Sequence, residues 1–151
     1  MSLFLATLSL VTAGATSRKP LQDAAVAAPP KRRILCKVPE NVASCYWTHG
    51  RLSYANGNPS FRIWKIGTDR VLGVFSGPAH FDDEDTEFPL ELSKAYETDA
   101  RRHIRATGTI PHFAPDIFAD FEVCPLKPEK EGHMQPVCIE SARKIFIKKD
   151  Y

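Results

Sequence analysis

The residues best suited to acid–base chemistry in this sequence are five histidines, which are scattered along the chain. A hydrolase needs a nucleophile with a base and an orienting group, or two carboxylates at a defined separation. The sequence contains no G-x-S-x-G, no H-E-x-x-H and no glycine-rich phosphate loop. We therefore predict no catalytic residue. The histidines are at positions 49, 80, 103, 112 and 133.

A dense acidic segment, HFDDEDTE at residues 80–87, could in principle attract a metal ion. Hard cations prefer carboxylate oxygens, but the spacing here does not follow the EF-hand pattern. Charge runs of this kind are usually solvated. We predict an exposed acidic loop, with no metal site and no cofactor.

Aromatic and guanidinium side chains give the clearest indication of binding. Alternate residues of an extended strand face the same side, and strands are predicted over residues 44–54 and 60–66. If their outward faces coincide, the sheet presents tryptophan beside arginine, a surface on which planar ligands stack. The predicted ligand-binding residues are Trp47, His49, Arg51, Arg62, Trp64 and Arg70.

Structural explanations for the same residues stay open at this stage. Trp64 is as well suited to a core position as to the surface, because tryptophan is rarely buried completely. The arginines could pair across neighbouring strands with acidic residues instead of meeting a ligand. The acidic residues available for that are Asp69, Asp120 and Glu122.

The elements that must position these residues follow from turn signals and apolar periodicity. Asn56-Gly57 and the segment GTDR predict turns that divide residues 44–75 into a three-strand meander. Gly73, inside the third strand, predicts a bulge or a sharp bend. The predicted strands cover residues 44–54, 60–66, 71–75, 118–126 and 137–147, the last as one strand or two.

One helix is predicted, over residues 90–106. Its apolar residues recur every four positions, which places them on one stripe. Ser93 is a possible N-cap and Gly108 a possible end. The arginines at 101, 102 and 105 gather near the C-terminus, where the helix dipole favours cations. The stripe consists of Leu92, Tyr96, Ala100 and Ile104.

Three strands, a helix and two more strands predict a mainly β fold. This order fits a small five-stranded Greek-key barrel of the OB type, with the helix between strands three and four. A small β-sandwich is the alternative.

The N-terminal segment has a different composition from the rest. It is uncharged and apolar up to small residues around Ala13-Gly14-Ala15, which is typical of a secretory signal peptide, although no Lys or Arg precedes the apolar run. An Ala/Pro-rich stretch ending in Lys31-Arg32-Arg33 follows. The predicted organisation is a signal peptide over residues 1–15, a flexible spacer over 16–33 and a single β-rich domain over 34–151.

Composition and cysteine usage agree with export. The chain has 151 residues, a net charge of +2 and 43% hydrophobic residues, too little positive charge to indicate nucleic acid by itself. The four cysteines, Cys36, Cys45, Cys124 and Cys138, show no zinc-site spacing. Two disulfides in an oxidising compartment are the natural interpretation, with three pairings open.

The segments GRLSYANGNPSFRIWKIGTDRVLGV, FADFEVCPL and VCIESARKI fall within residues 44–145. They resemble a group of small uncharacterised bacterial exported proteins. The shared pattern is a signal peptide, a core of G-R-L, N-G-x-P-S, R-I-W and G-T-x-R-x-L-G-V, and a D-F-x-V-C-P-L segment. The acidic segment and the helix look longer here than in that group. The resemblance implies export and no particular activity.

The same resemblance implies a disulfide pairing. Cys45, before the first strand, and Cys124, in the fourth, match the pattern best. These strands are neighbours in an OB barrel, which implies a Cys45–Cys124 bond, with Cys36–Cys138 as the second pair.

The sequence therefore predicts a disulfide-containing small β-barrel, periplasmic or secreted and without a membrane span. Its predicted function is non-enzymatic binding or interaction in the cell envelope. The partner would be an anionic or saccharide ligand or an envelope protein. One alternative is a small periplasmic hydrolase with a site near His49 and the acidic segment. Another, if the chain is not exported, is a cytosolic nucleic-acid-binding barrel.

Overall fold

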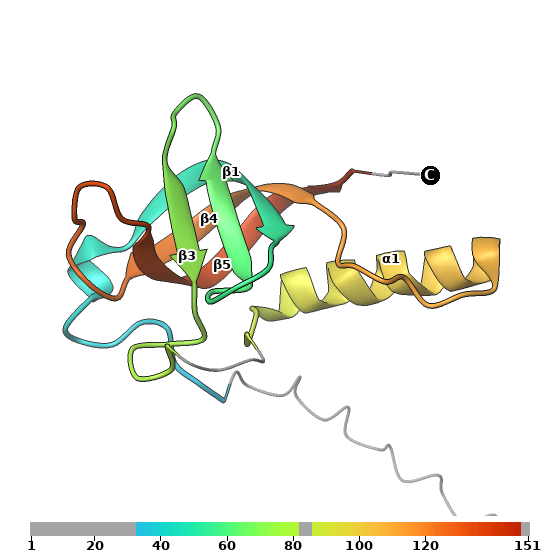
Figure 1. Cartoon of the computed structure of the whole chain (residues 1–151). Coiled ribbons are helices and arrows are strands. Elements are labelled where there is room, and N and C mark those ends of the chain that lie inside the picture. The colour runs from blue at the N-terminus through green and yellow to red at the C-terminus, as the bar shows by residue number, and fades with distance from the viewer. Residues whose placement is uncertain (1–32, 82–85, 149–151) are drawn as a thin grey trace, which may run out of the picture. The chain divides into compact units, whose positions relative to one another are not determined.

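The computed structural model describes residues 33–81 and 86–148 (Figure 1). The predicted signal peptide, nearly all of the predicted spacer and the acidic residues 82–85 lie outside the described residues. The elements are the 3-10 turn η1 (Val42–Ser44), the strands β1 (Tyr46–Tyr54), β2 (Phe61–Lys65) and β3 (Val71–Val74), the helix α1 (Leu90–Thr107), and the strands β4 (Ile117–Pro125) and β5 (Gln135–Ile147).

The five strands close into a barrel in the order β1-β2-β3-β5-β4. Every neighbouring pair is antiparallel except β3 and β5, which run parallel. This closure and the single helix between β3 and β4 confirm the predicted OB-type barrel and exclude the sandwich. The last segment forms one long strand, which begins two residues earlier than predicted.

The barrel is filled by the inward half of each strand. Leu52, Ile63 and Phe121 are fully buried, and Leu92 of α1 closes the core from one end. The buried residues of the core are Leu52, Ile63, Leu72, Val74, Leu92, Ile117, Ala119, Phe121, Val123, Val137 and Ile139. Since side chains alternate along a strand, the residues between these positions face outward.

Two glycines allow close approaches inside the sheet. A Cβ on Gly50 would lie 2.5 Å from Ile63 Cγ2 and 3.1 Å from the carbonyl oxygen of Trp64. A Cβ on Gly73 would lie 2.8 Å from Pro59 Cγ. Of the bulge or sharp bend predicted at Gly73, the bulge is absent, because the pairing of Gly73 with Arg62 is regular. Glycine is needed there for the contact with Pro59, and the irregularities of the sheet fall between β4 and β5.

Both disulfides implied by the resemblance are present, Cys45–Cys124 and Cys36–Cys138. They attach the segment before β1 to β4 and β5 and form a second buried cluster outside the main core. Asn41 orders this segment, since its side chain accepts the Val38 N–H at 2.9 Å and donates to the Cys36 carbonyl at 2.9 Å. Disulfides of this kind persist in oxidising compartments.

The helix begins earlier than its predicted cap. The N–H groups of Leu92 and Ser93 both donate to the Pro89 carbonyl, so Ser93 lies inside the first turns and the prediction of an N-cap there is wrong. Gly108 ends the helix as predicted, with φ at 73° and its N–H bound to Ile104 O. Within the described ranges, no helix combines the length and apolar character that crossing a membrane requires.

We expect Gly50→Ala to lower the free energy of unfolding by about 1–3 kcal/mol, because the added methyl group overpacks the barrel against Ile63. Urea unfolding with both disulfides intact measures this. Ser53→Ala in the same strand is the control. The Ser53 hydroxyl is buried without a hydrogen-bond partner, so its removal is expected to be neutral or slightly stabilising. Equal losses in the two variants would contradict the close-packing argument.

Candidate functional site

The outward side of β1 carries three of the predicted binding residues. Gly50 and Leu52 of this strand are buried in the barrel, whereas Trp47 and His49 are exposed and Arg51 is half-buried. All three alternate with the inward positions, as strand geometry requires. Trp47 keeps 43% of its surface exposed, so the strand presents a large aromatic side chain to solvent.

Strand β2 adds Trp64 to the same face, because Arg51 and Trp64 are direct partners in the β1–β2 register. Trp64 is 44% exposed. Of the two positions that the sequence left open for it, Trp64 therefore takes the surface and not the core. The guanidinium carbon of Arg51 lies 5.6 Å from the centre of the Trp64 ring, within the range of a cation–π contact. Asp116 Oδ2 lies 3.7 Å from Arg51 Nη1, a partly exposed ion pair.

Strands β4 and β5 extend this line into an aromatic row. Phe118 of β4 is the register partner of Arg51, and Phe146 of β5 is the partner of Phe118. The two phenyl rings lie 6.4 Å apart, and Phe146 is 63% exposed. The aromatic row, defined as Trp64, Arg51, Phe118 and Phe146, therefore crosses four strands on the outside of the barrel.

A β-bulge concentrates charge beside this row. The β4–β5 register shifts between Phe118 and Asp120, and Lys144 has a positive φ of 54°. Consecutive strand residues normally face opposite sides, yet here Arg143 and Lys144 both reach Asp120. Arg143 Nε and Lys144 Nζ lie 3.6 and 3.0 Å from Asp120 Oδ2. A non-glycine residue in this backbone region is strained, and such strain often marks a functional site.

A second contact between a cation and a tryptophan lies next to the bulge. The Arg143 guanidinium carbon lies 4.0 Å from the centre of the Trp47 ring. Trp47 and Arg51 are four residues apart on β1, a distance of about 13 Å at the usual rise of a strand. Between the two stacks lies His49, whose Nδ1 is 3.0 Å from Asp120 Oδ1. We call Trp47, His49, Asp120, Arg143 and Lys144 the bulge cluster.

Arg62, although predicted to bind, has a structural role. It faces outward opposite Ser53, but its Nη2 donates to the Asn56 carbonyl at 3.0 Å and its Nε to the Pro59 carbonyl at 3.4 Å. These bonds hold the loop between β1 and β2 in place.

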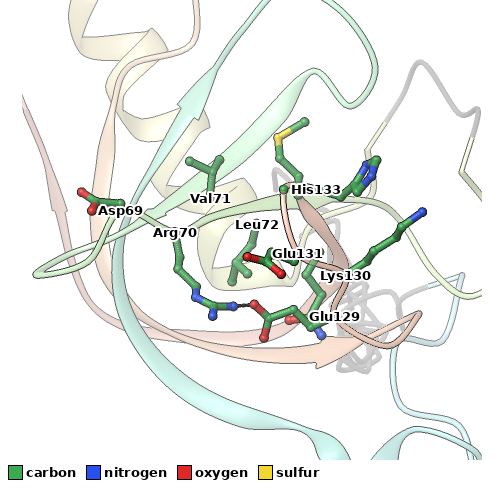
Figure 2. Close-up of a pocket in the computed structure, with 11 residues that line it drawn as sticks. Asp69, Arg70, Val71, Leu72, Glu129, Lys130, Glu131 and His133 are labelled. Atoms are coloured by element: carbon green, nitrogen blue, oxygen red, sulfur yellow. Dashed lines mark ion pairs between the residues drawn. The ribbon is translucent and has the colours of Figure 1, made fainter.

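Arg70 lies in the turn between β2 and β3, directly before Val71, the register partner of Trp64, and its side chain pairs outside the aromatic row. It forms an ion pair with Glu129 across a pocket of about 430 Å³ (Figure 2). The β2–β3 turn and the loop before β5 build the walls of this pocket, whose lining mixes charges of both signs. The six predicted binding residues therefore do not form one site. Arg51, Arg62 and Arg70 do not pair with Asp69, Asp120 or Glu122, the alternative partners that the sequence offered. Arg51 pairs with Asp116, Arg70 with Glu129, and Arg62 with backbone carbonyls.

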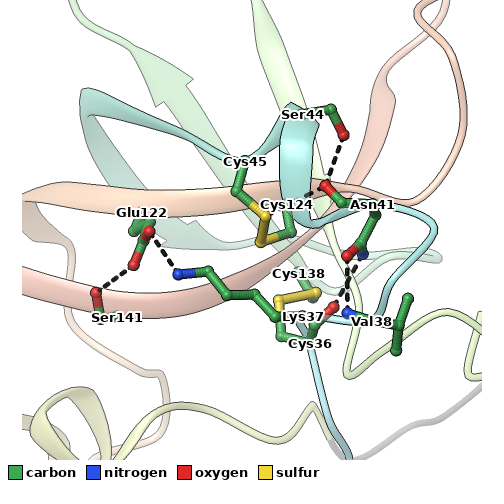
Figure 3. Close-up of a disulfide and its surroundings, with 10 residues drawn as sticks. All are labelled: Cys36, Lys37, Val38, Asn41, Ser44, Cys45, Glu122, Cys124, Cys138 and Ser141. Atoms are coloured by element: carbon green, nitrogen blue, oxygen red, sulfur yellow. Dashed lines mark hydrogen bonds and ion pairs between the residues drawn. A yellow bond between two sulfur atoms is a disulfide. The ribbon is translucent and has the colours of Figure 1, made fainter.

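Glu122 joins the sheet to the N-terminal segment instead. Lys37 Nζ lies 2.7 Å from Glu122 Oε1, and the Ser141 hydroxyl donates to Oε2 at 3.1 Å (Figure 3). Ser141 and Lys144 also stand in an S-x-x-K sequence, which some hydrolases use for a nucleophile and its base. Here Ser141 binds Glu122 whereas Lys144 binds Asp120, so the two side chains have different partners.

The carboxyl groups of this face are held in their charged form. The pKa of Asp120 is lowered by the hydrogen bond from Lys144 and then by that from His49. The pKa of Glu122 is lowered mainly by the hydrogen bond from Lys37. Charged, hydrogen-bonded carboxylates accept hydrogen bonds well but are poor general acids at neutral pH. Across residues 33–81 and 86–148, no group of three or more His, Cys, Asp or Glu side chains could hold a metal ion.

Sequence reasoning missed Phe118, Phe146, Arg143 and Lys144. The signal for the last two is the pair Arg143-Lys144 inside a strand, where two consecutive charged residues break the alternation. The two phenylalanines could not be placed without the register of four strands. The chain matches no protein-family model, no curated protein and no solved structure.

We expect Glu122→Gln to lower stability by about 1 kcal/mol at pH 7, because Lys37 loses a charged partner that is partly buried. The folded-state pKa of Glu122 lies below its ordinary value of 4.5. Its charge therefore stabilises the fold fully above that pH, and this contribution is lost as the pH falls through the folded-state pKa. Urea unfolding at several pH values should show the variant losing less stability than the wild type between roughly pH 5 and pH 3.

Glu131→Gln is the matched control, since Glu131 makes no hydrogen bond or ion pair within the described part of the chain. It should follow the wild-type pH profile. A wild-type profile for Glu122→Gln would show that Lys37 and Glu122 contribute nothing to the acid limit of stability.

Proposed function

We propose that this chain is an exported, non-enzymatic binding module that holds an acidic saccharide on the outward face of β2, β1, β4 and β5. The observation that carries the proposal is the pair of half-exposed tryptophans, each stacked with an arginine. Large aromatic groups exposed on one face of a sheet are typical of interaction sites.

The spacing of these groups favours an extended ligand. The two cation–tryptophan stacks are separated by about 13 Å along β1, a span longer than a single sugar ring. Phe118 and Phe146 continue the contact surface across the barrel. A chain of rings can therefore lie over the face and contact more than one aromatic group at once.

The charges of the face favour a ligand with sparse negative charge and many hydroxyl groups. Asp120 supplies charged acceptor oxygens, and Arg143 and Lys144 supply donors around it. Asp116 neutralises Arg51 and Glu122 neutralises Lys37. The face thus has only a small excess of positive charge. A nucleic acid, with one phosphate for each nucleotide, would find too few free cations.

Export is supported by two features. The first residues have the composition of a signal peptide, and both disulfides belong to a type that reducing compartments do not maintain. The proposed location is the periplasm or the cell exterior. An acidic polysaccharide of the cell envelope or its surroundings would be encountered there.

Binding can be tested with short hyaluronan oligosaccharides as acidic probes, using tryptophan fluorescence. Trp47→Ala and Trp64→Ala are each expected to weaken binding about tenfold, since truncating an aromatic anchor of a binding surface costs more than about 1 kcal/mol. Arg143→Gln should weaken it to a similar degree. Leu35→Ala is the control, because Leu35 is 65% exposed but belongs to the N-terminal segment.

Two further probes separate the alternatives. A chitin oligosaccharide of equal length should bind more weakly, because it lacks the carboxylates that meet Arg143 and Lys144. Single-stranded oligodeoxythymidine should also bind weakly. Tight binding of the oligonucleotide with a steep salt dependence would instead support the nucleic-acid alternative. If Leu35→Ala weakened saccharide binding as much as the tryptophan variants do, the aromatic face would not be the binding site.

Export has its own test, an intact mass of the chain recovered from a Gram-negative host. We expect the loss of N-terminal residues and a mass increase of about four daltons on reduction, because each of two disulfides takes up two hydrogens. A variant without residues 2–15 is the control and should stay in the cytoplasm with free thiols. A chain that keeps its first residues and has free thiols would contradict export.

A further inference from the structure

The apolar stripe of α1 is longer than the barrel that covers it. Leu92, in the first turn, is fully buried, and Tyr96 one turn later is packed against Phe61 and Phe88. Ile104, on the same stripe, is 43% exposed. Figure 1 shows the reason, because the C-terminal part of the helix extends beyond the barrel. The helix is attached at its other end, where Glu91 Oε1 accepts the Ala142 N–H at 2.7 Å.

The segment that follows the helix adds apolar groups without burying them. The chain turns at Gly108 and runs back alongside the helix before entering β4 (Figure 1). Along this return, Ile110 is 76% exposed and Phe113 is 73% exposed. Residues 100–115 thus form an arm with three exposed large apolar side chains, which we call the distal arm.

The distal arm is also cationic. It contains Arg101, Arg102 and Arg105 and no acidic residue. The Arg101–Glu97 pair, at 3.3 Å, is exposed on both sides, and such pairs contribute little. Arg102 Nη1 lies 3.9 Å from Oδ1 of the buried Asp99, but the Arg102 side chain is itself half-exposed. Arg105 has no hydrogen-bond or ion-pair partner among the described residues. Arg101 and Arg105 can therefore turn toward an external anion, while the half-exposed Arg102 can meet one from its place beside Asp99.

We propose that the distal arm binds the surface of an anionic lipid bilayer, with Ile104, Ile110 and Phe113 entering the interface and the arginines meeting lipid phosphates. Apolar and basic side chains combined on one short segment are the pattern of interfacial membrane contact. Anionic headgroups attract each nearby arginine, while apolar groups gain by leaving water. The contact is peripheral, and it does not use the aromatic row or the bulge cluster.

Vesicle co-flotation tests this with the full disulfide-bonded chain. We expect binding to vesicles of equal parts phosphatidylglycerol and phosphatidylcholine, and little binding to phosphatidylcholine alone. Replacing the three arginines by glutamine should weaken partitioning about a hundredfold, at roughly fivefold for each arginine. The charge-matched control replaces Lys94, Lys127 and Lys130 by glutamine, and it should retain most of the binding.

The apolar contribution is tested by Ile110→Ser combined with Phe113→Ser, at unchanged charge. We expect at least a tenfold loss, with the remaining binding abolished by moderate salt. Trp64→Ala should bind vesicles as the wild type does, which separates this proposal from the saccharide site.

Three results would overturn the lipid proposal. The first is equal binding to neutral and anionic vesicles. The second is an equal loss in the lysine control, which would indicate attraction by net charge alone. The third is no vesicle binding together with concentration-dependent self-association that Ile110→Ser and Phe113→Ser abolish, which would make the arm a contact between copies of the chain. Unchanged thermal unfolding of the variants confirms that they are folded.

Discussion

The pairing of β1 with two neighbours is the constraint on which the rest of the structure depends. β1 bonds to β2 on one side and to β4 on the other, and this closes the barrel. Closure buries one side of every strand and leaves the other to solvent. Because register partners lie directly opposite each other, it also aligns Trp64, Arg51 and Phe118. The same pairing therefore creates both the core and the candidate binding face.

The candidate binding face combines rigid support with one strained position. Its aromatic groups stand on strands that share a packed core, so their spacing is set by backbone geometry. The bulge at Lys144 departs from that regularity and brings two consecutive cations to Asp120. Bulges often redirect side chains in this way next to functional sites. A regular strand would have directed one of the two cations toward the barrel interior.

The two ends of α1 are in different environments. Its first turns complete the barrel core through Leu92, while its last turns carry apolar and basic side chains into solvent. Burial in the core explains the apolar side chains in the first turns of the helix. It does not explain those in the last turns, which remain exposed. The N-terminal segment, in contrast, is fixed to the barrel. The two disulfides and Lys37 bind it to β4 and β5. The contacts that fix the N-terminal segment and the first turns of α1 are therefore made with the barrel.

Much of this architecture was determined by local sequence. Alternating side chains, the glycine turns and the four-residue stripe of the helix are local patterns, and they predicted the elements, their order and Trp47, His49 and Arg51 as one outward group. The resemblance implied the disulfide pairs. Only the tertiary structure decided that Trp64 is exposed and that Arg62 and Arg70 pair with groups outside the aromatic row. It also decided which further residues join the candidate face: Phe118, Phe146, Arg143 and Lys144. These facts depend on strand register and on a backbone irregularity, which are set by contacts between residues far apart in the chain.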